Sequence, residues 1–215
     1  AENEFTWQKK WDKVLDFDLR KPSIKWFEGA KLNITENCID RHLDTIGDQT
    51  AIIFEPNNPD EDSQHISYRD LAVNVNKTAN MLKALGAKKG DRICIYMPMT
   101  PELAYAVLAC ARIGAIHSVV FAGFSSKSLS DRIEDAQCSI LVTADGGFRG
   151  QKITPLKEIA DQALEKCDCI DRVLVLKRTD IEISMKADRD FWWHEEFEKA
   201  HDECPAEIMD AEDML

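Results

Sequence analysis

The chain has 215 residues, of which 44% are hydrophobic and 31% are charged, and its formal net charge is -12. This composition is typical of a globular protein and excludes the intrinsically disordered class. Residues 179–215 carry 13 of the 39 acidic residues but 3 of the 27 basic ones, which leaves residues 1–178 nearly neutral. Nucleic acids and anionic membranes are excluded as partners, because both require clustered Lys and Arg.

The sequence contains no stretch that is typical of a membrane or secretory segment. The longest apolar region, residues 103–124, is interrupted by Arg112, Gly114 and His117, so we expect no membrane-spanning helix. The N-terminal residues are polar and lack the apolar centre of a signal peptide. The seven cysteines are scattered through apolar runs instead of forming a loop-borne disulfide framework, so a cytoplasmic location is expected.

The first 48 residues contain three of the five tryptophans. Trp7, Trp11 and Leu15 recur at helical spacing, and the segment 38–45 repeats this pattern. The pattern predicts two short helices whose aromatic faces lie against a larger body. We therefore expect an N-terminal helical and aromatic wrap.

The rest of the chain alternates between strand and helix patterns. Helix starts and stops are indicated by a capping box at Ser67 and Asp70, by Thr100 before a helix that stops at Gly114, and by Thr154 as a further cap. In chain order we expect a strand at 49–55, its hairpin partner at 65–68, a helix at 67–86, a strand at 92–99, a helix at 100–114, a strand at 115–121, a helix from 126, a strand at 138–143, a helix at 153–166 and a strand at 172–178.

This alternation predicts an α/β fold. Its continuous apolar strands indicate a doubly wound, mostly parallel sheet with helices on both faces. Right-handed crossovers would bring the loops that follow the strands, 98–100, 122–126 and 145–152, to one edge of the sheet.

We expect three regions. They are a wrap with the first strand at residues 1–62, a sheet subdomain at 63–178 that carries the site loops, and an acidic helix-and-loop segment at 179–215.

Two of these loops carry chemistry that suits an anion. Gly123 would let a ligand approach the backbone, and the helix that begins near Ser126 offers unpaired amides. Arg149 and Lys152 follow two glycines and are both suited to phosphate. A phosphate-bearing small molecule is one interpretation. Ordinary turns with solvated bases are the other, and spacing alone does not separate the two.

Catalytic and metal motifs are not found in the sequence. It contains no nucleotide phosphate loop, dinucleotide fingerprint, GxSxG or HExxH pattern. His194, His201 and Cys204 lack the spacing of a tetrahedral zinc site, as do Cys167 and Cys169. We assign no catalytic residue and expect no metal site.

Several stretches, taken together and in this order, resemble the N-terminal portion of the acetyl-CoA synthetase family of adenylate-forming enzymes. They are KWFEGAKLNITENCIDRHL, ISYRDL, GDRICIYMPMTPELAYAVLACARIGAIHSVVFAGFSSKSLSDRI and LVTADGGFRGQK. The resemblance implies a part of a larger adenylate-forming domain. It also implies activation of acetate by ATP and magnesium to an acyl-adenylate, from which CoA displaces AMP to give the thioester.

The resemblance further implies two groups of cofactor-binding residues. One group would bind the 3′-phosphoadenosine end of CoA and consists of Arg149, Gly150, Gln151 and Lys152. The other would form a wall beside the nucleotide and consists of Phe121, Ala122 and Gly123.

Two positions depart from the family pattern. Ala122 stands where the family commonly has glycine. Its methyl group reduces the space in which a ligand can approach the backbone. Lys152 stands where the family commonly has arginine, which keeps the charge but loses the planar fork. Both departures bear on affinity for CoA and not on the fold.

The resemblance also implies machinery that this sequence does not contain. It implies a phosphate loop, an acyl pocket, adenine-binding motifs and a C-terminal domain with a catalytic lysine beyond Leu215, and Ala1 in place of methionine agrees with an excised fragment. We therefore expect an inactive N-terminal fragment whose packing partner is the remainder of its parent. A fragment of a propionate or other short-chain acyl-CoA ligase, or a stand-alone nucleotide-binding or interaction module, remains open.

Overall fold

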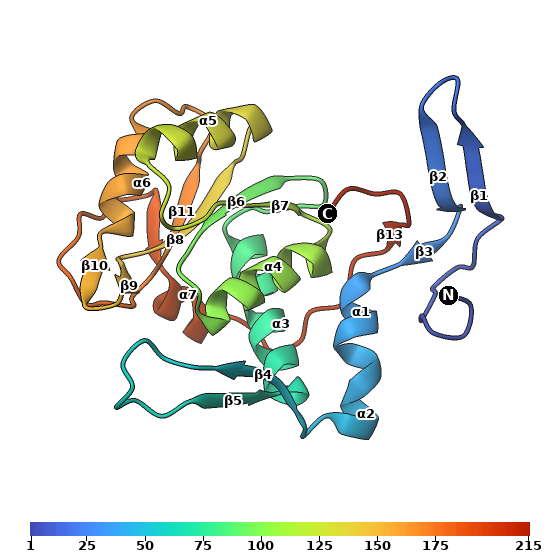
Figure 1. Ribbon diagram of the computed structural model, residues 1–215, viewed down its shortest axis with the longest axis horizontal. Coiled ribbons are helices and arrows are strands. Elements are labelled where there is room, and N and C mark those ends of the chain that lie inside the picture. Colours follow the sequence, from blue (N-terminus) through green and yellow to red (C-terminus); the bar gives the residue numbers. More distant parts are fainter.

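The computed structural model describes residues 1–215 and is built around a five-stranded sheet (Figure 1). The strand order is β12-β11-β8-β6-β7, and every neighbouring pair is parallel. The strands are β6 (Arg92–Tyr96), β7 (Ile116–Val119), β8 (Ile140–Ala144), β11 (Arg172–Leu176) and β12 (Asp190–Trp192). The predicted parallel α/β sheet is confirmed.

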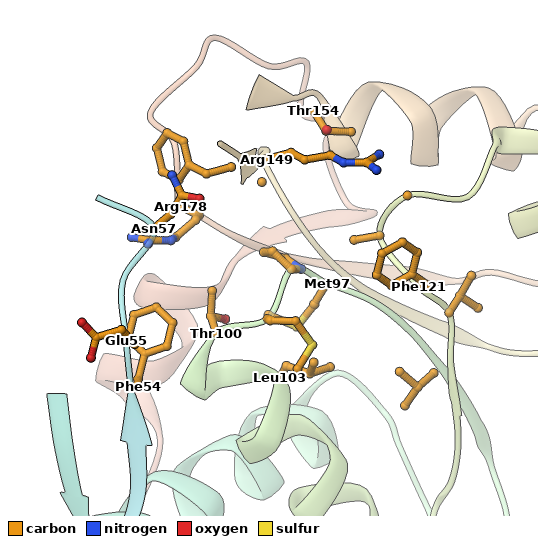
Figure 2. A pocket seen from close by; sticks show the side chains of 18 residues that line it. Phe54, Glu55, Asn57, Met97, Thr100, Leu103, Phe121, Arg149, Thr154 and Arg178 are labelled. Atoms are coloured by element: carbon orange, nitrogen blue, oxygen red, sulfur yellow. The ribbon is translucent and has the colours of Figure 1, made fainter. Parts of the chain in front are cut away.

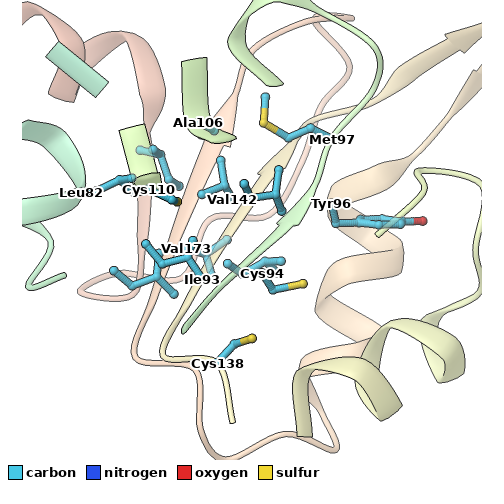
Figure 3. Close-up of a cluster of buried hydrophobic side chains, with 14 of the residues drawn as sticks. Leu82, Ile93, Cys94, Tyr96, Met97, Ala106, Cys110, Cys138, Val142 and Val173 are labelled. Atoms are coloured by element: carbon cyan, nitrogen blue, oxygen red, sulfur yellow. The ribbon is translucent and has the colours of Figure 1, made fainter. Parts of the chain in front are cut away.

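Helices cover both faces of this sheet (Figure 1). One face carries α3 (Tyr68–Ala84), α4 (Pro101–Ile113) and α7 (Trp193–Lys199), and the other carries α5 (Ser126–Ala136) and α6 (Leu156–Leu164). The central strands are therefore buried on both sides, which explains their continuous apolar runs. Figure 3 shows side chains from three of these strands, Ile93, Val142 and Val173, in this core with Leu82 of α3 and Ala106 of α4.

The predicted helix signals act as capping groups in two places. Ser67 and Asp70 form a capping box at the start of α3, and Gly114 ends α4 with a left-handed φ of 71°. A Cβ at Gly114 would lie 2.6 Å from the Met209 sulfur, so both the backbone conformation and the space require glycine. None of the helices combines the length and the apolar character that crossing a bilayer requires.

The helix predicted at Trp7 to Leu15 is wrong. Residues 13–28 form a hairpin of β1 (Lys13–Asp18) and β2 (Ser23–Glu28). Trp7 and Trp11 contact each other at a ring-centroid distance of 5.1 Å, and Phe27 of β2 lies 5.2 and 5.1 Å from them. The helical spacing of the two tryptophans thus reflects a cluster that a residue of the hairpin completes.

The second helical segment predicted near the N-terminus is confirmed. It consists of α1 (Ile34–Cys38), a short 3-10 turn (Asp40–His42) and α2 (Leu43–Ile46). The predicted hairpin after it is also confirmed, with β4 (Thr50–Phe54) paired to β5 (Gln64–Ser67).

The region 145–152 is not the single loop that we predicted. It contains β9 (Gly147–Arg149), which pairs with β10 (Lys152–Thr154) in a tight hairpin. Because Thr154 is in this ladder, it does not cap α6, whose N-cap is Pro155. The acidic C-terminal segment also contains strands that we did not predict, β12 in the main sheet and β13 (Met209–Asp210), which pairs with β3 (Lys31–Leu32).

A buried asparagine joins the N-terminal segment to the rest of the molecule. The Asn33 amide donates to the carbonyls of Ala111, Arg112 and Glu207 at 2.9–3.2 Å. Its side-chain oxygen accepts from the backbone N–H and the hydroxyl of Thr35, in the first turn of α1. One side chain therefore satisfies groups from α1, the end of α4 and the C-terminal segment.

Arg112 adds a second connection beside Asn33. Its guanidinium is buried and donates to Asp40 at 3.0 Å, to the Thr35 hydroxyl at 3.2 Å and to the Cys204 carbonyl at 2.5 Å. A buried cation requires partners of this kind, because an unpaired charge is costly in the interior.

Asn33→Ala is expected to lower the free energy of unfolding by about 2–3 kcal/mol, since it leaves several buried polar groups without partners. Urea denaturation followed by circular dichroism measures this loss. The matched control is Asn74→Ala, which removes a single hydrogen bond from a less buried helix position. A loss no larger than that of the control would contradict the role of Asn33.

Candidate functional site

The carboxyl-terminal edge of the sheet contains a cavity of about 580 Å³ (Figure 2). Residues from all three predicted strand-end loops line it, so the structure brings these loops together. The lining residues are Phe54, Glu55, Asn57, Met97, Pro98, Met99, Thr100, Leu103, Val119, Val120, Phe121, Ala122, Gly123, Gly147, Phe148, Arg149, Thr154 and Arg178.

The loop after β7 forms one wall of this cavity. The Phe121 side chain is 64% exposed there, and its ring contacts Phe124 edge-on with a centroid distance of 5.9 Å. A Cβ at Gly123 would lie 2.6 Å from the Phe121 ring, so glycine makes room for this ring. Ala122 lies between them and packs against the main core.

A buried tyrosine at the end of β6 supports the same loop. The Tyr96 hydroxyl donates a hydrogen bond to the Phe124 carbonyl at 2.8 Å. Burial raises the pKa of Tyr96, so its hydroxyl remains a donor at neutral pH. A side chain at the carboxyl end of β6 therefore supports the wall.

The β9 and β10 hairpin presents two basic side chains together. Arg149 and Lys152 are directly opposite each other in the ladder, and Gly150 and Gln151 form the turn between them, with Gly150 at a φ of 60°. Both basic side chains are exposed and neither forms an ion pair. Like charges in such a cross-strand pair repel each other, and a bound anion would relieve this repulsion.

The predicted site residues divide between two cavities. Phe121, Ala122, Gly123 and Arg149 line the large one. Gly150 and Gln151 line a second cavity of about 480 Å³, between the hairpin and residues 57–61, whereas Lys152 lines neither.

The turn of the hairpin is tied to the neighbouring segment. The Asn57 amide donates to the Gly150 carbonyl at 2.8 Å, and this bond joins the loop after β4 to the turn. The two cavities are therefore neighbours across Asn57, Phe148 and Arg178, which line both of them.

Sequence reasoning missed Arg178 and the two rings beside it. The Arg178 guanidinium lies over the Phe54 ring at 5.8 Å and over the Phe148 ring at 5.3 Å. Arg178 follows β11, so the rule that pointed to the other strand-end loops could have found it. Phe54 belongs to the β4 hairpin, outside the parallel sheet, and no pattern in the sequence linked it to this edge.

Asp145, at the end of β8, fixes the geometry of this edge. Its carboxylate is fully buried and accepts from the backbone N–H groups of Arg178 at 2.8 Å, Thr179 at 3.0 Å and Asp180 at 2.7 Å. It also accepts from its neighbour Gly146, where a Cβ would lie 2.6 Å from the Thr179 hydroxyl. The turns after β8 and β11 are thereby locked together.

The site joins an apolar cavity to an unpaired cationic rim and contains no nucleophile hydrogen-bonded to a base. Elsewhere, no three His, Cys, Asp or Glu side chains lie together in a way that could hold a metal ion.

Two family models match the chain end to end. Residues 1–38 match the model described as the acetyl-coenzyme A synthetase N-terminus, and residues 39–215 match the model described as the AMP-binding enzyme.

Curated relatives match over the whole chain but are much longer. The acetyl-coenzyme A synthetase of Magnetococcus marinus is 56% identical over 215 residues, which are 100% of this chain and 33% of the relative. The acetyl-coenzyme A synthetase of Bdellovibrio bacteriovorus is 53% identical over 210 residues, 97% of this chain and 33% of the relative. The chain thus spans about one third of the length of these relatives.

A solved structure shares the fold. Acetoacetyl-CoA synthetase from Streptomyces lividans superposes with a TM-score of 0.85 at 23% sequence identity, covering 96% of this chain and 31% of that one. At this identity the likeness supports the fold alone.

Asp145→Asn is expected to lower the free energy of unfolding by about 2–3 kcal/mol. The amide removes the negative charge to which the backbone N–H groups donate, and its NH2 group would face these N–H donors without an acceptor. Urea denaturation measures the loss. The control is Asp135→Asn on the exposed face of α5, which is expected to stay within about 0.5 kcal/mol of the parent sequence. Equal effects of the two substitutions would contradict the role of Asp145.

Proposed function

The chain belongs to the AMP-binding enzyme family, and from this premise we propose that it is the N-terminal part of an acetate:CoA ligase and supplies the CoA side of its active site. The support is the match of the whole chain, in order, to two family models and to relatives of that name. The observation that carries the proposal is the cross-strand pair of Arg149 and Lys152, which form no ion pair and of which Arg149 lines the large cavity.

The proposed reaction of the parent protein takes acetate, ATP and CoA. Acetate attacks the α-phosphorus of magnesium-bound ATP to give acetyl-adenylate and pyrophosphate. The CoA thiol then displaces AMP and forms acetyl-CoA. The residues of this chain take part by binding and by shaping the cavity, so we assign the bond-making steps to the remainder of the parent, which is also the proposed packing partner.

The proposed CoA contacts follow from charge and shape. The Arg149 fork and the Lys152 ammonium would bind the 3′-phosphate, and the turn at Gly150 and Gln151 would lie beside the adenosine. On the other side of the cavity, Phe121 would form an apolar wall for the ligand. Lys152 offers no planar fork, so Arg149 would carry the larger share of phosphate recognition.

The shape of the wall supports the same proposal. Ala122 brings the backbone to the cavity with a small side chain, and Gly123 leaves room for the Phe121 ring that forms the wall. We also propose the cytoplasm as the compartment, because seven free cysteines, most of them buried, are typical of a reducing environment.

Arg149→Ala is expected to weaken binding of adenosine 3′,5′-bisphosphate, a fragment of CoA, by about tenfold or more, because a charge-assisted bidentate contact is lost. Isothermal titration calorimetry on the 215-residue chain measures this change. Arg20→Ala, in the exposed turn between β1 and β2, is the control and leaves the affinity unchanged. An unchanged affinity of the Arg149 variant would remove Arg149 from the site.

The 215-residue chain is expected to release no pyrophosphate in the presence of acetate, ATP and magnesium, because it has no group that can activate the carboxylate. A coupled pyrophosphate assay checks this. The parent protein is expected to be active under the same conditions and to prefer acetate to propionate. Adenylation by the chain alone would contradict the proposed division of labour, and a preference for propionate would replace acetate as the substrate.

A further inference from the structure

Arg178 is a basic side chain that has no partner within the chain. Its guanidinium forms no ion pair and donates no hydrogen bond, although the chain carries a net charge of -12. The buried Arg112, in contrast, is fully engaged by a carboxylate, a hydroxyl and a carbonyl. The donors of Arg178 are thus available to a ligand.

Two aromatic rings lie near this guanidinium, and the backbone of Arg178 is held by a hydrogen bond. The rings of Phe54 and Phe148 lie 5.8 and 5.3 Å from its central carbon, and its own backbone N–H is held by the Asp145 carboxylate at 2.8 Å. Rings that cover the faces of a guanidinium leave the edge, where the N–H donors lie, free for contact. Because the main chain is held and the side chain is restricted, the guanidinium loses little conformational entropy when it binds a ligand.

Arg178 lies apart from the basic pair of the hairpin. It follows β11, whereas Arg149 is on β9, and both line the large cavity. Figure 2 shows Arg178 beside Asn57, while the Arg149 guanidinium is directed toward the side of the cavity that Phe121 lines. The edge of the sheet therefore offers two separate cationic centres.

We infer that Arg178 is a second phosphate-binding residue and that this site takes a ligand with two separate phosphate centres. The inference rests on the proposed function, which assigns the 3′-phosphate of the ligand to Arg149 and Lys152. The second centre is then the phosphate on the 5′ side of the same nucleoside, and Arg178 binds it through the free edge of its guanidinium. The two centres together select nucleoside 3′,5′-bisphosphates over nucleoside monophosphates.

The test compares three probes, adenosine 3′,5′-bisphosphate, adenosine 3′-monophosphate and adenosine 5′-monophosphate, by ligand-observed NMR titration of the 215-residue chain. Arg178→Met keeps an apolar side chain beside the two rings and removes every guanidinium donor. It is expected to weaken the bisphosphate and the 5′-monophosphate by about tenfold and to leave the 3′-monophosphate unchanged. Arg149→Ala is expected to give the opposite pattern for the two monophosphates.

Two further variants separate binding from packing. Arg178→Lys keeps the charge but not the fork and is expected to fall between the parent sequence and Arg178→Met for the 5′-phosphate probes. Arg172→Met, at the other end of β11, removes an arginine that lies over the Phe191 ring at 6.0 Å and lines neither cavity, so all three affinities are expected to stay unchanged. If Arg178 served only in packing, Arg178→Met would change the midpoint of urea denaturation. The relative affinities for the three probes would then stay as they are in the parent sequence, which would overturn the inference.

The outcomes separate this inference from the function on which it rests. If Arg149→Ala weakens the bisphosphate and Arg178→Met does not, the second centre is overturned and the proposed CoA site stands. If Arg178→Met and Arg149→Ala weaken the same monophosphate, both residues bind one phosphate and the two-centre model is overturned. If the parent sequence binds none of the probes, the proposed function itself fails, and this inference fails with it.

Discussion

The arrangement of the site depends on one buried carboxylate. Asp145 has no basic side chain as a partner and is satisfied by the backbone N–H groups of Gly146 and of residues 178–180. Since a buried charge without partners is strongly unfavourable, the turns after β8 and β11 must stay where they can donate to it. The first turn leads into the hairpin that carries Arg149, and the second carries Arg178. A single acceptor thus sets the relative position of the two cationic centres.

The parts of the fold that depend on local patterns could be predicted from the sequence. The capping box at Ser67 and Asp70 and the left-handed Gly114 mark helix ends by interactions within a few residues, and both are present. The parallel sheet follows from apolar runs that alternate with helices. The helix predicted at Trp7 and Trp11 is wrong, because the conformation of this segment depends on contacts with Phe27 and on pairing to Lys31. Both partners are too distant in the sequence to be seen from the spacing of residues within one helix.

The candidate site was predictable where topology alone determines proximity. Loops after parallel strands meet at one edge, which is why Phe121 and Arg149 line the same cavity although 28 positions separate them in the sequence. The hairpin at 147–154 was not predicted, since its strands are short and its turn resembles an ordinary glycine-rich loop. Phe54 could not be predicted as a site residue, because its position beside Arg178 depends on how the β4 hairpin packs on the sheet.

The positive charge of this edge arises from the placement of acids and not from an excess of bases. In and beside α6, the buried Lys157 is paired with Asp161 and Asp190, and Arg189 binds the same two carboxylates. Burial alone would raise the pKa of Asp190, but hydrogen bonds from Arg189, from the Lys186 N–H and from Lys157 lower it below its ordinary value, so the carboxylate stays charged.

At the strand-end edge no carboxylate forms an ion pair with Arg149, Lys152 or Arg178, although Glu55 lines the large cavity and Glu61 lines the second one. An acidic protein can therefore present a small cationic site whose field is limited to about 10 Å by the surrounding negative charge and by salt. Such a site does not attract polyanions from a distance, and under the proposed function it would bind a small phosphate ester.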